Sequence, residues 1–316
     1  MLSVSLLSAL VATASIADAH FHFGRLAVNG EWKPLMQYIR NKTSPFEDEP
    51  WTPYQNWNTR DYFFPTYATD LPNSVRCGRG NLAWAPKTDI LRVKAGDTME
   101  FVAFGGYPYE WNDTELFQFE GCPEGRGVCS SKWSGGMTKL QHFGPVLVHL
   151  SQVPEGQSLT SYDGSGEWVK IHTTGFKIVD GGKPWWLAYN GLDYQSNGQP
   201  ERFIFKVPKQ TPAGQYLMRV DLAWPGFVYK LGADLISDVQ GQLYPSCAQI
   251  EVESDVTGSL PKGIKIPEDL QPKSQGMQTS LEMYNNQKVD EGYVYPGGPL
   301  WDGEKLIEDM APTKME

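Results

Sequence analysis

Short segments in which apolar and polar residues alternate recur along the chain, which is the pattern of β-strands that bury one face. They are rich in β-branched and aromatic residues, and Gly, Pro, Asn or Asp bounds each one. The segments are residues 21–28, 89–104, 144–153, 168–176, 202–224 and 243–253. No long segment keeps the period of an amphipathic helix. The pattern therefore predicts an all-β protein, an immunoglobulin-like antiparallel β-sandwich with long aromatic-rich loops.

Two regions depart from this pattern. Residues 31–76 form a loop-like stretch rich in Pro, Trp and Tyr, which is long for a connection within a domain. Because its aromatic density favours packing, we expect this loop to be ordered and functional. From residue 253 onward, the composition shifts to Pro, Lys, Gln and Ser. We expect residues 253–316 to wrap around or trail from a domain formed by residues 20–252.

Residues 1–19 have the composition of a secretory signal peptide, an apolar run of Leu, Val and Ala that ends in the small-residue pattern Ala17-Asp18-Ala19. Cleavage after this pattern would export the chain. Acceptor sequences for N-glycosylation at Asn41 and Asn112 are compatible with export. No apolar tail follows residue 290, so neither a membrane-spanning helix nor a lipid anchor is expected there. The sequence therefore predicts a secreted, extracellular protein without membrane insertion.

The formal net charge of the chain is −10 at pH 7. Nucleic acid and anionic lipid must be met by clustered Lys and Arg, so this charge argues against both as partners. With 40% hydrophobic and 20% charged residues, the chain can still build a sizeable core. A neutral or cationic partner is compatible with the composition, and we expect the protein to be a monomer.

The four cysteines of an exported chain are expected to form disulfides rather than a metal cluster. Three pairings are compatible with four cysteines. We favour Cys122 with Cys129, which bracket a short Gly-rich loop, and Cys77 with Cys247, which would link distant parts of the chain.

Cleavage of the leader would make His20 the first residue of the mature chain. A free α-amino group has an ordinary pKa of about 7.7–8.0, so it can lose its proton to a metal near neutral pH. His20 then offers two nitrogen donors, its amine and its imidazole. His142, just before the segment that begins at residue 144, is the best third donor. Three nitrogens in a T-shaped plane favour copper(II) over zinc or magnesium.

The remaining histidines have other expected roles. His149 and His172 lie within predicted strands, and we expect them to be structural or surface residues. His22 offers an alternative copper site, because an unfolded terminus His20-Phe21-His22 can bind copper through its amine, two amide nitrogens and the third-residue imidazole. The amides of a terminal strand are engaged in the sheet, which disfavours this mode.

Five segments in a fixed order carry a resemblance to a known family. They are HFHFGRLAVNG at the cleaved terminus, QHFGPVLVHLSQV, TPAGQYLMRVDLA, GQLYPSCAQIEV and VYPGGPLW. Each segment alone is weak evidence for a family, but their order together with a mature N-terminal histidine is strong evidence. The chain resembles the fungal copper-dependent lytic polysaccharide monooxygenases of auxiliary-activity family nine, once classified as endoglucanases, over most of its mature length.

This resemblance implies roles for four residues. In the family, the terminal histidine and the histidine before the Gly-Pro-Val strand form a histidine brace around one copper ion, which maps to His20 and His142. The tyrosine of the Gln-x-Tyr element takes a distant axial position, which maps to Tyr244. Gln242 would hydrogen-bond the oxygen species at the metal. Since Gln242 and Tyr244 are two apart in an extended segment, their side chains face the same way.

One feature departs from the family. Members usually carry, shortly after the arginine equivalent to Arg219, a histidine that assists the glutamine in handling bound oxygen. No histidine lies between Arg219 and Tyr244 here, and the stretch is longer than the family pattern. We expect copper binding to survive and oxygen or peroxide turnover to be impaired, because a proton donor near the metal is missing. The family's long disulfide, by contrast, coincides with the Cys77–Cys247 pairing.

The leading hypothesis is a copper-dependent monooxygenase that takes electrons from an external donor. It would oxidatively cleave glycosidic bonds in a β-linked polysaccharide such as cellulose or another glucan. Sugar rings stack on exposed aromatic side chains. The candidates for this contact are Trp32, Tyr54, Trp57 and Tyr295.

Two alternatives belong to other functional classes. The first is a secreted copper-binding protein with the same fold and little or no oxygenase activity, acting in copper handling or cell-wall organisation. The missing histidine supports it. The second is a glycoside hydrolase that works through two carboxylates. The chain has 37 acidic residues, and spacing singles out no pair of them.

Overall fold

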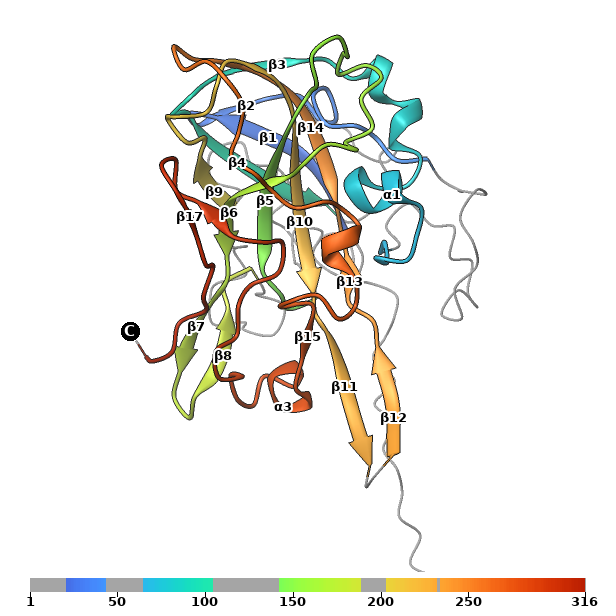
Figure 1. The fold of residues 1–316 in the computed structure, drawn as a ribbon, viewed down its shortest axis with the longest axis vertical. Helices are drawn as coiled ribbons and strands as arrows, with labels where there is room; N and C mark the ends of the chain where they lie inside the picture. The colour runs from blue at the N-terminus through green and yellow to red at the C-terminus, as the bar shows by residue number, and fades with distance from the viewer. Residues whose placement is uncertain (1–20, 44–64, 105–141, 189–202, 232–233, 316) are drawn as a thin grey trace, which may run out of the picture.

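Two β-sheets pack face to face and enclose the main core of the protein (Figure 1). This computed structural model describes residues 21–43, 65–104, 142–188, 203–231 and 234–315. The arrangement confirms the predicted immunoglobulin-like sandwich, and each of the six predicted strand segments contains at least one strand.

The smaller sheet has the strand order β2-β1-β4-β9 in the described residues. Its strands are β1 (His22–Val28), β2 (Glu31–Trp32), β4 (Thr98–Phe104) and β9 (Phe203–Lys206). The turn between β1 and β2 is Asn29-Gly30, with φ angles of 51° and 84°. Positive φ at both residues is what a two-residue type I′ hairpin loop requires, and Asn-Gly adopts it at little cost.

The larger sheet has the order β17-β16-β6-β5-β10-β14-β3, and β13 pairs with the end of β10. Its strands are β3 (Leu91–Lys94), β5 (Val146–Gln152), β6 (Val169–Thr174), β10 (Gly214–Trp224), β13 (Gln242–Leu243), β14 (Ser246–Glu253), β16 (Leu300–Trp301) and β17 (Leu306–Ile307). Most pairings are antiparallel, but β14 with β3 and β16 with β6 are parallel. These two pairings join segments far apart in sequence, where no tight turn imposes the antiparallel direction.

The side chains of β10 alternate between two hydrophobic clusters, one on each face of the larger sheet. One set of its side chains enters the core between the sheets, and this set is Tyr216, Met218, Val220 and Leu222. Leu217, Arg219 and Asp221 point to the opposite face because successive strand residues alternate. That face is covered by a second cluster, to which Val75, Leu159, Trp168 and Ile266 belong.

Several elements have no counterpart in the sequence predictions. They are α1 (Pro72–Cys77), α3 (Leu281–Tyr284), the 3-10 turns η2 (Asn81–Ala83), η3 (Ala85–Lys87) and η7 (Glu268–Leu270), the hairpin β7 (Phe176–Val179) with β8 (Lys183–Trp186), and the hairpin β11 (Gly226–Leu231) with β12 (Asp234–Val239). A further short strand, β15 (Gln278–Thr279), runs parallel to β11. Short helices and hairpins of this kind carry too few residues to show a period.

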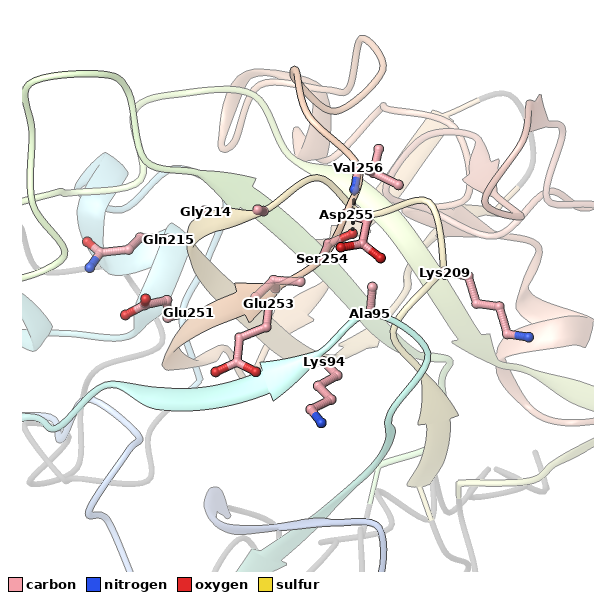
Figure 2. Close-up of a pocket in the computed structure, with 12 residues that line it drawn as sticks. Lys94, Ala95, Lys209, Gly214, Gln215, Glu251, Glu253, Ser254, Asp255 and Val256 are labelled. Atoms are coloured by element: carbon pink, nitrogen blue, oxygen red, sulfur yellow. Dashed lines mark hydrogen bonds between the residues drawn. The ribbon is translucent and has the colours of Figure 1, made fainter.

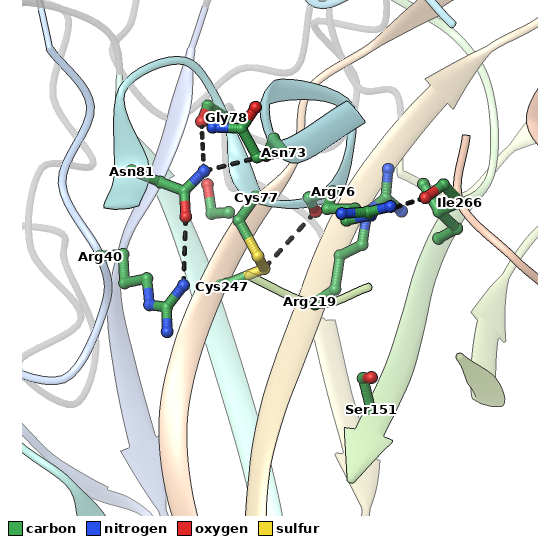
Figure 3. Close-up of a disulfide and its surroundings, with 12 residues drawn as sticks. Arg40, Asn73, Arg76, Cys77, Gly78, Asn81, Ser151, Arg219, Cys247 and Ile266 are labelled. Carbon is green, nitrogen blue, oxygen red and sulfur yellow. Dashed lines mark hydrogen bonds between the residues drawn. A yellow bond between two sulfur atoms is a disulfide. The ribbon is translucent and has the colours of Figure 1, made fainter. Parts of the chain in front are cut away.

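A disulfide joins Cys77 at the end of α1 to Cys247 in β14, which confirms this predicted pairing (Figure 3). Both cysteines are buried. Beside the disulfide, Arg219 Nε donates to the carbonyl oxygen of Arg76 at 2.8 Å. The disulfide and the Arg219 guanidinium together hold α1 against the outer face of the larger sheet. Cys122 and Cys129 lie outside the described residues.

The C-terminal segment is folded onto the sandwich. Lys170 Nζ, buried on β6, lies 2.7 Å from Asp309 Oδ2 and donates to the carbonyl oxygen of Pro296 at 2.8 Å. Thr173 Oγ1 donates to the same carboxylate at 2.6 Å. We propose that residues 253–316 are an extension of the domain at 20–252.

Residues 1–19 lie outside the described residues. Among the described residues, no helix is long and apolar enough to cross a bilayer.

Replacing Asp309 with Ala is expected to lower the free energy of unfolding by about 3–5 kcal/mol, because Lys170 would remain buried without its counter-ion. Urea unfolding of the two variants and the wild type measures this loss of stability. Glu308→Ala, an exposed neighbour on the same segment, is the matched control and should cost no more than about 0.5 kcal/mol. Equal effects of the two substitutions would show that the ion pair does not hold the segment.

Candidate metal centre

His142 lies at one end of the sandwich, four residues before β5, and its ring is held by aromatic neighbours. The imidazole stacks on the indole of Trp224 with ring centroids 4.0 Å apart and planes 14° apart. It also stacks on Tyr244 at 5.7 Å and 29°. Trp224 is the last residue of β10, and Tyr244 lies between β13 and β14. Three segments far apart in sequence therefore meet at His142.

The same tyrosine connects His142 to the beginning of β1. The ring of Phe21 stacks on Tyr244 with centroids 4.5 Å apart and planes 18° apart. Phe21 is bonded directly to His20, and His20 itself lies outside the described residues. Tyr244 is thus in contact with His142 and with the residue that follows His20.

Tyr244 is fixed through both its side chain and its backbone. Its hydroxyl donates to Gln242 Oε1 at 2.7 Å, so the two side chains meet on one side of the segment, as predicted. Its backbone N–H donates to Asp221 Oδ1 at 2.6 Å. Asp221 Oδ2 in turn accepts from Arg219 Nη2 at 2.7 Å, and both charged groups are fully enclosed. Burial raises the pKa of the Tyr244 phenol well above its ordinary value, which keeps it neutral.

His22 lies inside the structure rather than on a free terminus. It pairs with Phe104 in the smaller sheet, and its Nδ1 lies 3.0 Å from Ser246 Oγ. Burial, with a smaller contribution from the charge of Lys42, lowers the pKa of the imidazole well below its ordinary value. An enclosed imidazole in a formed strand disfavours the mode in which the first three residues wrap around copper.

His149 and His172 make local contacts, as expected for structural residues. His149 is buried on β5, with Nε2 2.9 Å from the carbonyl oxygen of Gly297. His172 on β6 lies with Nε2 3.0 Å from Thr174 Oγ1. Burial lowers the pKa of His172 to about 4, so its ring is neutral.

The sugar-stacking prediction was wrong for Tyr295. Its ring is buried and packs edge-on against Phe176 at 5.7 Å, and its hydroxyl accepts from the Phe176 N–H at 3.0 Å. The sequence suggested a loop, but the C-terminal segment docks on the sandwich and encloses this side chain. A ring in this position offers no face to a polysaccharide.

Trp32 does not join the cluster around His142. Trp32 pairs with Ala27 and lies below the guanidinium of Arg25, 5.4 Å from its Cζ. Ala27 is five residues along β1 from His22, about 17 Å at the rise of a strand. Tyr54 and Trp57 lie outside the described residues, as does the glycosylation candidate Asn112. The other, Asn41, is half-buried, and its Oδ1 accepts from the Lys42 N–H at 2.8 Å.

The aromatic residues that do surround His142 were missed by the sequence analysis. Tyr284 of α3 stacks on Trp224 at 5.5 Å and contacts Phe227 at 4.1 Å. Phe143 packs edge-on against Trp224 at 5.9 Å. Trp224 Nε1 is buried and has no hydrogen-bond partner among the described residues. The signal in the sequence was Trp224, an aromatic residue five positions after Arg219, in a stretch that contains no histidine.

A hollow of about 870 Å³ lies at the other end of β10 (Figure 2). It opens near Gly214, about 33 Å along the strand from Trp224. Its lining is mostly charged or small and includes Lys94, Lys209 and Glu253. No histidine, cysteine or aromatic residue of the described part lines it. This hollow therefore has neither nitrogen ligands for a transition metal nor a ring for sugar stacking.

The donors at His142 suit copper better than a hard cation. Within the described ranges, no three His, Cys, Asp or Glu side chains gather as a metal site, so His142 needs donors from elsewhere. The nearest carboxylate in the network, Asp221, is already engaged by Arg219 and the Tyr244 N–H. Imidazole with a neutral phenol nearby is a set for copper or another borderline metal, whereas magnesium and calcium require carboxylate oxygens.

Comparison with known proteins agrees with this geometry. The model of Auxiliary Activity family 9 (formerly GH61) matches residues 20–293. AA9 family lytic polysaccharide monooxygenase D of Emericella nidulans is 28% identical over 302 residues, covering 96% of this chain and 84% of the relative. AA9 family lytic polysaccharide monooxygenase A of Aspergillus fumigatus is 28% identical over 300 residues, covering 94% and 81%.

Solved structures share the fold at low sequence identity. HiLPMO9B has a TM-score of 0.53 and 18% identity, covering 90% of this chain and all of its own. A cellulose-active polysaccharide monooxygenase from M. thermophila has a TM-score of 0.52 and 21% identity, and the match covers 90% of this chain and 99% of the other. The family match spans the residues around His142 and every strand of the two sheets except β16 and β17. The chain therefore belongs to Auxiliary Activity family 9, the copper-dependent lytic polysaccharide monooxygenases, and is an oxidoreductase.

Proposed function

We propose that this chain is a secreted monooxygenase that binds one copper ion through His20 and His142 and oxidatively cleaves glycosidic bonds in a β-linked polysaccharide such as cellulose or another glucan. The observation that carries the proposal is the contact of Tyr244 with both His142 and Phe21. It brings the residue bonded to His20 to the same ring as the second proposed ligand. The family match also begins at residue 20, and the curated relatives come from fungi.

The amine and imidazole of His20 and the imidazole of His142 would hold the copper ion, and the Tyr244 phenol would lie beside them. When bound, copper supplies one-electron redox chemistry, fed by an external donor, for the oxidation of the sugar. Trp224 and Tyr244 hold the His142 ring by stacking, which limits the reorganisation needed when the metal binds. The Asp221 carboxylate holds the Tyr244 backbone in place.

Gln242 is oriented for the role that the family resemblance gives it. Its Oε1 accepts from the Tyr244 hydroxyl at 2.7 Å. Its Nε2 makes no hydrogen bond to another residue of the described part and is the end that can donate to an oxygen ligand. Gln242 pairs with Trp224 across the end of the sheet, so it faces the region of His142.

The alternative of a copper-binding protein with little oxygenase activity draws support from Trp224. An indole N–H donates a hydrogen bond but does not act as a proton donor near neutral pH, unlike a histidine. Family membership places the chain among oxidoreductases, so the alternative concerns the rate of turnover. The glycoside hydrolase hypothesis has no support from the family match.

Mass spectrometry of the secreted protein is expected to find His20 as its first residue, and titration to find one copper ion per chain. His142→Ala should weaken copper binding more than about 100-fold, because it removes a ligand rather than an outer partner. His172→Ala is the control and should leave the affinity unchanged. Electron paramagnetic resonance follows the same titrations. A mature chain that begins elsewhere, or a signal lost only in His22→Ala, would contradict the proposed site.

Products test the reaction itself. We expect oxidised sugar ends from a β-glucan only when both copper and a reductant are present, as detected by mass spectrometry of the released oligosaccharides. Tight copper binding without products would favour the copper-handling alternative. Unoxidised ends released without copper would point to hydrolysis.

Substitutions of Trp224 separate its stacking on the His142 ring from its inability to donate a proton. Trp224→Phe keeps an aromatic ring on His142, so copper affinity should stay within about threefold of wild type. Trp224→Ala should weaken copper binding by about tenfold or more and destabilise the apoprotein by about 2 kcal/mol, because His142 loses its support. Trp224→His should raise the rate of product formation by about tenfold or more, since imidazole can deliver a proton. An unchanged rate in Trp224→His would show that the missing histidine does not limit turnover.

A further inference from the structure

The end of the sandwich that carries His142 is not flat. The hairpin β11–β12 starts two residues after Trp224 and returns to the chain just before Gln242. Figure 1 shows it extending past the end of β10, along the long axis of the molecule. The hairpin β7–β8 extends beyond the same end, on the other side of α3. Both hairpins therefore project on the side where the proposed copper ligands lie.

The base of β11–β12 is fixed by the C-terminal segment. The Gly226 N–H donates to the carbonyl oxygen of Met277 at 2.9 Å, and Thr279 Oγ1 donates to the Gly226 carbonyl at 3.2 Å. The Phe227 ring packs on Tyr284 at 4.1 Å. A Cβ on Gly226 would clash with the carbonyl oxygen of Val239, so only glycine allows the two strands to approach this closely at the base of the hairpin. These contacts keep the hairpin from swinging away from the site.

The same segment fixes the second hairpin. Trp186 Nε1 donates to Asn286 Oδ1 at 3.0 Å, and the Val289 N–H donates to the carbonyl oxygen of Gly182 at 3.1 Å. The Trp186 ring also packs edge-on against Phe176 at 4.8 Å. Residues 277–289 therefore support both hairpins and hold them in one arrangement relative to His142.

The length of the hairpins decides what can approach. The six residues of β11 reach about 20 Å, and the four of β7 about 13 Å, at the rise of a strand. A flat crystalline face that approaches this end would meet the hairpins before it reached His142. A separated chain can bend and enter from the side. The rings of Trp224, Phe143 and Tyr284 are half-buried at this end, so each is partly exposed to such a chain.

We propose that this site takes single, separated chains of a neutral β-glucan, in amorphous or soluble form, and not the face of a crystal. This proposal rests on the function proposed above and refines its substrate class. The net charge of −10 is compatible with a neutral chain and disfavours a polyanionic one.

The binding of the copper-free protein to cellulose tests this proposal, because binding does not depend on turnover. The protein is mixed with microcrystalline cellulose, with acid-swollen amorphous cellulose, and with cellohexaose as competitor. Wild type is expected to bind amorphous cellulose at least about tenfold more tightly than crystalline cellulose at equal accessible surface, and cellohexaose should displace it. A shortened variant joins Val228 to Asp238, which are cross-strand partners, through an Asn-Gly turn. This shortened variant should bind amorphous cellulose no more than about threefold more tightly than crystalline cellulose.

Lys209→Ala is the matched control, since Lys209 lines the hollow at the other end of β10 and the substitution keeps both hairpins. It should show the wild-type preference, which separates the effect of the hairpins from the effect of an unrelated surface substitution. Equal binding of wild type to crystalline and amorphous cellulose would overturn the proposal, and this result does not require the shortened variant to fold. An unchanged preference in a folded shortened variant would also overturn it. Failure of copper binding in the earlier titrations would contradict the proposed function and leave this binding preference measurable.

Discussion

The buried ion pair between Arg219 and Asp221 is the constraint on which the proposed site depends. Both charged groups are removed from water, so each must find all of its partners within the protein. Arg219 finds them in Asp221 and in the carbonyl oxygens at the end of α1, and Asp221 in Arg219 and the Tyr244 N–H. These bonds join α1, β10 and Tyr244 in one arrangement, in which Arg219 donates through Nε and Nη2 and both oxygens of Asp221 accept. The position of His142 follows from it, because its ring stacks on Tyr244 and on the end of β10.

The strands and the long disulfide could be predicted because they leave a local or pairwise signal in the sequence. Alternation marked β10 and β14. The even number of cysteines predicted disulfides, and the short loop between Cys122 and Cys129 favoured pairing Cys77 with Cys247. The proximity of Gln242 and Tyr244 followed from the spacing of an extended segment. Residue 20 itself lies outside the described part, so the brace remains a prediction.

The surroundings of His142 could not be predicted because they depend on docking between distant segments. Tyr295 looked like a loop residue, but it is enclosed where the C-terminal segment meets β7. Tyr284 belongs to a helix of four residues, too short for any periodic signal, and only the fold brings it to Trp224. The same segment is anchored far from the site by the Lys170–Asp309 ion pair. The composition of this segment indicated a tail, whereas its residues 277–289 contact both hairpins beside His142.

The enclosed disulfide has a consequence for the conditions in which the protein can work. Enzymes of this family draw electrons from an external donor, and thiols are one class of reductant. Thiol–disulfide exchange requires a thiolate to reach a sulfur atom, but Cys77 and Cys247 are both 0% exposed. A thiol reductant in the medium therefore leaves the covalent link between α1 and β14 intact, as long as the domain remains folded.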